Sequence, residues 1–259
     1  MKRISRISRI SVTSRPALLG AVVMLALTSA SVAAADDGPG PLGVTADAVA
    51  TRQSARVGAL FDADRAGRPA GGHFCTASVV HSPRGDLIVT AAHCVDGDDG
   101  DLVFAPGYRD GQAPFGMWKV MRRFLPDAWT SGQDEDSDLA FAAVAERDGE
   151  RLEDVVGANR FAAGVATGAT AVTVIGYPDS REAPVTCTDK PASRSDTQQR
   201  VECPDFTGGT SGSPWVNGDG QVVGVIGGHE QGGATADVSY SVVLGGEAAE
   251  LYRDAMSAS

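Results

Sequence analysis

Short apolar runs separated by turn residues are the feature that most restricts the fold of this 259-residue chain. From residue 56 onward, runs rich in β-forming side chains recur, with Gly, Pro and Asp between them. Many short strands joined by tight turns are typical of β-sandwiches and β-barrels. The sequence therefore predicts an all-β protein, with strands at 57–61, 76–80, 87–92, 102–104, 118–124, 139–144, 171–177, 221–226 and 238–244.

The spacing of apolar residues changes near the C-terminus, where we expect a helix. Four residues there fall on one helical face: Ala248, Leu251, Tyr252 and Ala255. This pattern predicts a C-terminal helix and tail at 246–259. A polar stretch at 146–154 interrupts the strand pattern near the middle of the chain and is the predicted connection between two domains.

The first 35 residues have the pattern of an export signal. A basic stretch that ends at Arg15 precedes an apolar run at 17–27, and Ala33 and Ala35 stand where a signal peptidase requires small side chains. We expect cleavage after Ala35, followed by a flexible, Gly/Pro/Asp-rich leader or pro-segment at 36–52. An uncleaved amphipathic anchor is the alternative. The apolar run is too short for a comfortable membrane span, so we expect a secreted, extracellular protein without membrane attachment after cleavage.

The charge of the chain restricts its partners. It carries 22 basic and 33 acidic residues, for a formal net charge of −11. Five of the basic residues and none of the acidic ones lie in the first 35 positions, so the exported chain would be more acidic still. Because an acidic surface repels phosphate backbones and anionic lipids, we expect no nucleic-acid and no membrane partner.

Four cysteines follow the predicted signal: Cys75, Cys94, Cys187 and Cys203. An even number in an oxidising compartment favours disulfide bonds, and four cysteines permit three pairings. Pairing sequence neighbours would close loops of 19 and 16 residues. No CxxC or HxxxH spacing supports a zinc site.

The acidic run at 96–101 raises the question of calcium. An EF-hand loop requires a glutamate in its twelfth position, where this chain has Gly107. A solvated turn is therefore the preferred interpretation of the run, and we expect neither a metal nor a cofactor.

Three short segments contain side chains suited to covalent chemistry. Ser211 stands in a glycine-rich turn, GGTSGSP, where its hydroxyl can be exposed and backbone N–H groups can converge on one point. His93 ends an apolar strand in TAAHC, and Asp138 opens another in SDLAF. Taken singly, each has a simpler interpretation, namely a loop, a packed core histidine and a turn cap. Together they favour a nucleophile, its base and an orienting acid.

In their order along the chain, these segments resemble the histidine, aspartate and serine motifs of the trypsin-like serine proteases. The resemblance is to bacterial secreted members in particular, including the glutamyl-endopeptidase branch. It implies that Ser211 is the nucleophile, His93 its general base and Asp138 the acid that orients the imidazole. The backbone N–H groups of Gly209 and Ser211 would then form the oxyanion hole.

The same resemblance covers nearly all of the chain after the leader and implies a fold. Members of the family fold as two antiparallel β-barrels with the active site in the cleft between them, which here would be barrels at 53–150 and 151–245. Cys75 resembles the cysteine that bridges to the one after the catalytic histidine, here Cys94. The implied function is that of a secreted serine endopeptidase, expected as a monomer, that hydrolyses protein or peptide substrates through an acyl-enzyme on Ser211.

Other arrangements fit these residues less well. An α/β-hydrolase requires G-x-S-x-G and the order Ser, acid, His, whereas Ser213 replaces the last glycine and only His229 follows the serine. The subtilisin order would need an aspartate motif before His93. Three further acids precede Asp138: Asp134, Glu135 and Asp136. Only Asp138 is followed at once by apolar residues, which would carry it into a buried position.

The residues that would select a substrate are less sharply defined. Asp205, six residues before the nucleophile, resembles the trypsin carboxylate that binds Arg or Lys, although Phe206 is bulky for a pocket wall. Gly227 and Gly228 are the candidates for the other side of the pocket. Thr210 stands where trypsin has an aspartate that pairs with the new N-terminus, so we expect a site that does not depend on that pairing.

Two other functions could use the same scaffold. A catalytically silent binding module has no need of all three groups, and a serine esterase would use the same site on esters. Labelling of Ser211 by a fluorophosphonate would separate an enzyme from a silent module. Turnover of peptides against turnover of esters would separate a peptidase from an esterase.

Overall fold

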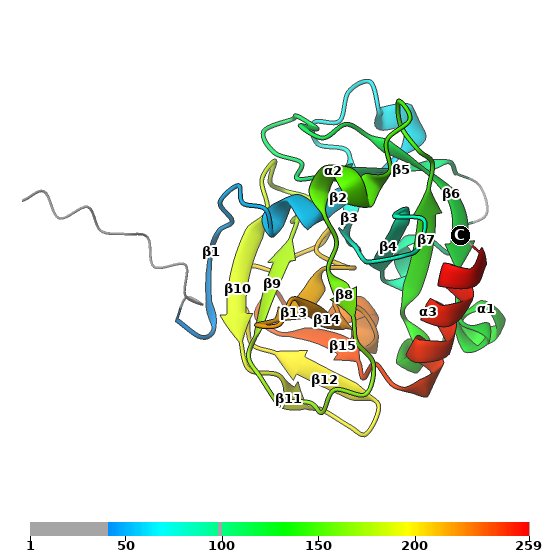
Figure 1. Cartoon of the computed structure of the whole chain (residues 1–259). Coiled ribbons are helices and arrows are strands. Elements are labelled where there is room, and N and C mark those ends of the chain that lie inside the picture. The colour runs from blue at the N-terminus through cyan, green and yellow to red at the C-terminus, as the bar shows by residue number, and fades with distance from the viewer. Residues whose placement is uncertain (1–40, 98–99, 259) are drawn as a thin grey trace, which may run out of the picture. The chain divides into compact units, whose positions relative to one another are not determined.

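The computed structural model of the chain describes residues 41–97 and 100–258 (Figure 1). The export signal predicted at 1–35, the first residues of the predicted leader, and two aspartates of the acidic run lie outside them. Among the described residues, no helix has both the length and the apolar character needed to cross a bilayer.

Six strands of the N-terminal half close into a barrel. They are β2 (Val57–Asp62), β3 (His73–Val79), β4 (Leu87–Thr90), β5 (Leu102–Pro106), β6 (Trp118–Phe124) and β7 (Ala140–Val144). Their order around the barrel is β2–β3–β4–β7–β6–β5, and every neighbouring pair is antiparallel. The six strands that the sequence predicts in this region are therefore confirmed.

Except for β6, in which Lys119, Met121 and Arg122 are exposed, the barrel strands are largely buried on both faces, which explains the long apolar runs in the sequence. Because side chains alternate along a strand, each strand contributes to two cores. In β4, Ile88 packs in the core inside the barrel, whereas Leu87 and Val89 belong to a core shared with the C-terminal half. In β7, Phe141 faces the shared core and the alanines on either side of it face the barrel interior.

The C-terminal half contains two sheets. The larger has the order β1 (Val44–Asp47), β10 (Val185–Asp189), β9 (Val172–Gly176), β13 (Pro214–Asn217), β14 (Gln221–Val225) and β8 (Arg160–Phe161). The smaller is formed by β11 (Ala192–Ser193), β12 (Gln198–Val201) and β15 (Ser239–Val242). Gly227 N–H donates to Tyr240 O at 3.0 Å and joins the sheets at one seam.

The disulfide between Cys187 in β10 and Cys203 after β12 joins the same two sheets elsewhere. Between the sheets lies a core that includes Val174, Val201 and Trp215. Among the described residues, the C-terminal half therefore consists of two sheets joined at a hydrogen-bonded seam and by a disulfide, and not of a second closed barrel. It is also not wholly antiparallel, as was predicted, because β8 pairs with β14 in parallel.

The leader was predicted to be flexible, but part of it forms a strand. Residues 44–47 form the edge strand β1, which pairs with β10, and Ala48 N–H donates to Pro184 O at 2.9 Å (Figure 1). The open edge of β10 satisfies the backbone groups of this segment, although its Gly/Pro-rich surroundings do not suggest a strand. The boundary of a pro-segment remains a prediction.

Helices are short except at the C-terminus. They are η1 (Ser54–Arg56), η2 (Ala63–Arg65), η3 (Ala92–Cys94), α1 (Asp127–Gly132), η4 (Glu135–Ser137), α2 (Leu152–Val156), η5 (His229–Gly232) and α3 (Gly246–Ala258). The predicted C-terminal helix is confirmed as α3, which lies beside β7 and β6 (Figure 1). Its buried face packs into the shared core through Ala248, Leu251 and Ala255.

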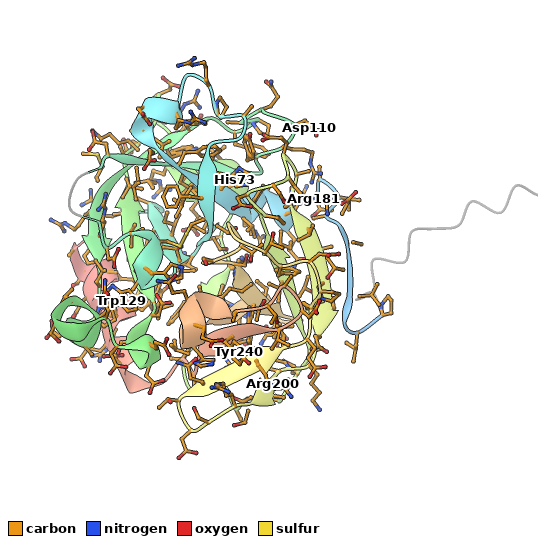
Figure 2. All side chains as sticks on the ribbon, turned by 180° about the vertical axis from the view of Figure 1, so that it is seen from behind. His73, Asp110, Trp129, Arg181, Arg200 and Tyr240 are labelled. Carbon is orange, nitrogen blue, oxygen red and sulfur yellow. A yellow bond between two sulfur atoms is a disulfide. The ribbon has the colours of Figure 1, made fainter. Side chains whose placement is uncertain are left out.

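Hydrogen bonds from buried polar groups also hold the two halves together. His73 of β3, labelled in Figure 2, is buried and donates from Nε2 to Pro178 O at 2.9 Å. The Tyr108 hydroxyl donates to Glu182, and the Tyr177 hydroxyl donates to a backbone carbonyl of β2 at 3.3 Å. Burial raises the pKa of both tyrosines, in Tyr108 together with Glu182, so both hydroxyls remain donors at neutral pH.

We predict that replacing Cys187 and Cys203 together by alanine lowers the free energy of unfolding by about 3 kcal/mol, because the bond closes a loop of 16 residues in the unfolded chain. Urea unfolding followed by tryptophan fluorescence measures this change. A loss below about 1 kcal/mol would contradict the view that this bond stabilises the junction of the two sheets.

Candidate active site

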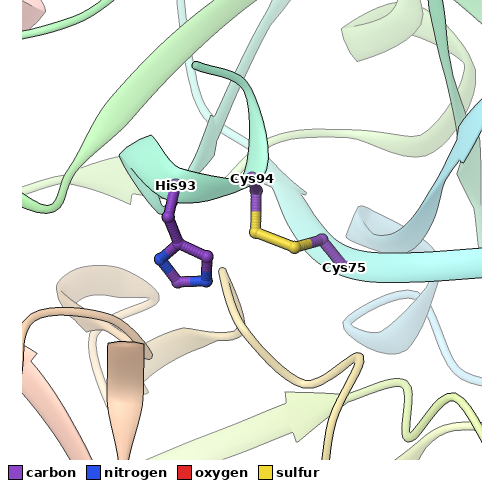
Figure 3. A group of neighbouring side chains, drawn as sticks. All are labelled: Cys75, His93 and Cys94. Carbon is purple, nitrogen blue, oxygen red and sulfur yellow. A yellow bond between two sulfur atoms is a disulfide. The ribbon is translucent and has the colours of Figure 1, made fainter. Parts of the chain in front are cut away.

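His93 is held at the end of a barrel strand. The chain leaves β4 after Thr90 and turns into η3, where Cys94 forms a disulfide with Cys75 of β3, at a Cα–Cα distance of 6.1 Å. Figure 3 shows the imidazole leaving η3 beside this disulfide. The side chain of His93 is 13% exposed, so it is shielded but still reachable from solvent.

Asp138 is a buried carboxylate that faces this histidine. It follows η4 and is 1% exposed. Its Oδ2 accepts a hydrogen bond from His93 Nδ1 at 2.7 Å, and its Oδ1 accepts one from the backbone N–H of His93 at 3.0 Å. Gly228 N–H donates to Oδ2 at 2.8 Å. A buried carboxylate is tolerated only when it is well hydrogen-bonded, and these three donors meet that need.

The three acids before Asp138 make other contacts. Asp134 accepts Asp136 N–H at 3.0 Å, and the Asp136 carboxylate accepts from Gln198 at 2.8 Å. Glu135 accepts Glu230 N–H at 3.1 Å. None of the three hydrogen-bonds to His93 within the described part of the chain, so Asp138 is the carboxylate that orients toward the imidazole.

Ser211 stands on a tight turn pressed against the barrel. Its carbonyl accepts Thr76 N–H at 2.7 Å, and the next residue, Gly212, donates to Ile226 O at 2.7 Å. Gly212 has φ 84°, and a Cβ there would lie 2.0 Å from Thr76 O and 2.2 Å from Thr90 Oγ1. The turn therefore packs directly on β3 and on the end of β4, where Thr90 precedes His93 by three residues.

Two backbone amides of this turn are left without acceptors. Within residues 41–97 and 100–258, neither the N–H of Gly209 nor that of Ser211 has a hydrogen-bond partner. Gly209 has φ 87°, and a Cβ there would lie 2.6 Å from both Asp179 N and Tyr177 O. The turn thus needs glycine at this position and presents unpaired donors beside the serine, as an anion-binding site requires.

The hydroxyl of Ser211 contacts η5. It donates to Gln231 O at 3.4 Å, a long hydrogen bond. Glu230 and Gln231 have φ of 51° and 55°, a left-handed conformation that is uncommon for residues with a side chain. The segment after Gly228 therefore turns back over the serine.

The residues predicted to select a substrate lie at different places. Gly227 lies against Asp138, since a Cβ there would be 2.9 Å from Asp138 O, and Gly228 reaches the same carboxylate. Asp205 lies on an exposed turn with φ 66°, whereas Phe206 is 5% exposed in the core of the C-terminal half. The structure brings the two glycines to the site and leaves Asp205 at the surface.

Thr210 lies inside the turn that carries Ser211. It is 3% exposed, and its hydroxyl donates to Thr207 O at 2.7 Å. A neutral side chain that is satisfied within its own turn needs no ion pair. Independence from an N-terminal ammonium remains a prediction.

The residues near His93 do not suit a metal ion. The ligand atoms of Cys75, His93 and Cys94 lie within 4.8 Å of one another, but both sulfurs are used in the disulfide, and His93 Nδ1 is bonded to Asp138. Thiolates, and not disulfide sulfurs, are the ligands that metals take from cysteine.

The side chain of Arg123 binds the backbone carbonyls in and beside the described part of the acidic run. The guanidinium of Arg123 donates to Val95 O at 3.2 Å and also to the carbonyls of Gly97 and Gly100. Inward-facing carbonyls are what a calcium loop offers its ion. In this chain the Arg123 guanidinium occupies these carbonyls in place of a calcium ion.

Gln198 of β12 also reaches this region, although it belongs to none of the sequence motifs. Its Nε2 donates to Glu135 O at 3.0 Å and to Asp136 at 2.8 Å. The segment around it, SDTQQR, is polar and shows no strand alternation. No pattern in the sequence therefore marked it.

A family model for the trypsin-like peptidase domain matches residues 75–225. This match spans more than half of the chain, which therefore belongs to the trypsin-like peptidase family. The predicted resemblance to trypsin-like serine proteases is confirmed. Among curated protein sequences, no relative matches the chain.

Solved structures of similar fold include three proteases. Protease Anisep from Arthrobacter nicotinovorans has a TM-score of 0.70 at 24% identity, over 82% of this chain and 99% of its own. Thermostable serine protease AL20 from an extremophilic microorganism has a TM-score of 0.68 at 25% identity, over 81% and 100%. A Glu endopeptidase in complex with MPD has a TM-score of 0.67 at 17% identity, over 85% and 99%. The fold is that of the chymotrypsin-like serine proteases.

We predict that Gly212→Ala destabilises the protein by about 3 kcal/mol or more, because the added methyl group overlaps Thr76 O and φ is positive. Gly218→Ala, on an exposed turn with no atom within 4 Å of its Cβ position, is the matched control and should change stability by about 0.5 kcal/mol or less. Urea unfolding compares the two. Equal stability of both variants would contradict the close packing of this turn on the barrel.

Proposed function

We propose that this chain is a serine endopeptidase with Ser211 as nucleophile, His93 as general base and Asp138 as orienting acid. The observation that carries the proposal is the His93–Asp138 hydrogen bond of 2.7 Å beside a serine turn with two unpaired amides. Membership of the trypsin-like peptidase family supports the same chemistry.

The hydrogen bond to Asp138 fixes the orientation and the tautomer of His93, the proposed base. A carboxylate can only accept, so the proton of the neutral imidazole resides on Nδ1 and leaves Nε2 with a lone pair. The Ser211 hydroxyl would turn from its long bond with Gln231 O to donate to Nε2. His93 then takes the serine proton as the oxygen attacks the substrate carbonyl, because the free hydroxyl is a poor nucleophile.

Charge that develops on the substrate oxygen would be met by the amides of Gly209 and Ser211. Each such donor typically lowers the barrier by about 3–4 kcal/mol. His93 would next give its proton to the leaving amine, and an acyl-enzyme on Ser211 would remain. Water, activated by the same imidazole, releases the acid and restores the serine.

We also propose that the chain acts after export, on protein or peptide substrates and as a monomer. The two disulfides suit an oxidising compartment. The negative net charge disfavours nucleic acid and anionic membranes as partners.

We predict that Ser211→Ala lowers kcat for peptide cleavage by about six orders of magnitude, because the nucleophile is lost while the fold remains. The exported wild-type protein should be labelled by a fluorophosphonate on Ser211, and the variant should not. More than a few per cent of wild-type activity in the variant would refute the nucleophile. A labelled enzyme that cleaves esters but not peptides would point to an esterase.

We predict that Asp138→Asn lowers kcat by about four orders of magnitude, because an amide donor opposite Nδ1 favours the wrong tautomer of His93. Asp134→Asn, in the same acidic segment, is the matched control, since asparagine can still accept Asp136 N–H. Initial-rate kinetics on one peptide compares the two. Equal effects of the two substitutions would remove Asp138 from its proposed role.

A further inference from the structure

Gln198 is a buried polar side chain of the C-terminal half that contacts the acid-bearing loop of the barrel. It is 5% exposed, and both protons of its Nε2 are used, toward Glu135 O at 3.0 Å and Asp136 Oδ1 at 2.8 Å. Its Oε1 accepts His229 N–H at 3.4 Å. A side chain with two donors and an acceptor therefore joins two segments that belong to different halves.

The backbone of Gln198 is held firmly enough to make it an anchor. Its strand β12 pairs with β15, and Gln198 lies opposite Val242. Its N–H donates to Ser195 Oγ at 3.0 Å, while its carbonyl accepts the N–H groups of Arg194 at 2.9 Å and Ser195 at 3.1 Å. The amide group is thus presented from a fixed point of the smaller sheet.

Both segments that Gln198 joins lead to the Asp138 carboxylate. Asp136 precedes Asp138 by two residues, so the amide holds the loop on the barrel side. His229 follows Gly228, whose N–H donates to Asp138 Oδ2 at 2.8 Å. Gly228 packs on the amide so closely that a Cβ there would lie 2.5 Å from Gln198 Oε1.

We propose that Gln198 is a positioning residue for the reaction, and that it holds Asp138 against Gly228 N–H so that the carboxylate keeps His93 aligned. This inference rests on the proposed function. Among the hydrogen bonds of the described residues, none joins Gln198 to the imidazole or to Ser211, so its proposed action is through Asp138. The surroundings offer two acceptors and one donor, which the two N–H donors and the oxygen of a carboxamide match. An ionised carboxylate can only accept, so it could not replace the amide.

The test compares two neighbouring glutamines of the same strand. Gln199 is 4% exposed and donates to Val223 O at 3.1 Å, away from the acid loop. We expect both Gln198→Leu and Gln199→Leu to lower stability, since each removes a buried amide from its acceptors. Only Gln198→Leu should lower kcat, by about 10- to 100-fold, with KM changed less than about twofold.

The pH–rate profile separates positioning from general destabilisation. A misaligned carboxylate stabilises the imidazolium less, so His93 gives up its proton more readily and the acidic limb of the profile should move to lower pH in Gln198→Leu. In Gln199→Leu the limb should stay in place. An unchanged limb and an unchanged kcat in Gln198→Leu would overturn the proposal.

A second variant keeps the test decisive if Gln198→Leu fails to fold. Asp136→Ala removes one of the two barrel-side acceptors of Gln198, on an exposed residue, and leaves Glu135 O in place. Because it also removes a negative charge two residues from Asp138, it is compared with Asp136→Asn, which removes the same charge but keeps an acceptor. The acidic limb should lie at lower pH in Asp136→Ala than in Asp136→Asn. If the limb lies at the same pH in both folded variants, the proposal is overturned.

A further measurement tests the positioning role of Gln198 even if the chain is not a peptidase. The His93 ring-proton signals, followed by NMR in a Ser211→Ala background, titrate without any turnover. A shift of this titration caused by Gln198→Leu supports the positioning role even if the wild-type protein cleaves no peptide. An active, fluorophosphonate-labelled wild type whose His93 titration is unmoved by the substitution overturns the positioning role and leaves the proposed function intact.

Discussion

The buried carboxylate of Asp138 is the constraint on which the rest of the site depends. At 1% exposure its charge has almost no contact with water, so protein donors must replace the lost solvation. Two donors come from His93 at the end of β4, and the third is Gly228 N–H, after β14. Because the donors come from both halves, the full site exists only when the halves are correctly docked.

Two apolar cores that are shared by the halves hold them together. In β4 and β7, alternate side chains point into the barrel and into the core shared with the C-terminal half, and α3 packs into the same shared core. A second shared core surrounds Phe61, Tyr108 and Tyr177. Close packing in both places holds the backbone amides of the serine turn and the imidazole in one arrangement. Preorganised donors of this kind need little rearrangement when charge develops.

The sequence predicted the strands with strong apolar patterns, the C-terminal helix and the family, because burial on two faces leaves long apolar runs. It did not predict β1, β8, β10, β11, β12 or β13, which are short segments whose backbone groups pair with neighbouring strands. Asp138 was distinguished from its acidic neighbours by the apolar residues after it. The contacts of Gln198 and Gly228 with the acid loop could not be predicted, since they arise where segments distant in sequence meet.

A crystal structure of the protein after reaction with a peptidyl phosphonate would show whether Ser211 is the nucleophile. We expect a phosphorus–Oγ bond on Ser211, with one phosphonyl oxygen about 3 Å from the N–H groups of Gly209 and Ser211. The Asp138–His93 hydrogen bond should persist, and the Ser211 hydroxyl should have left Gln231 O. A phosphonate bound to another side chain, or one whose oxygen faces solvent away from both amides, would show that Ser211 and these amides do not form the active site.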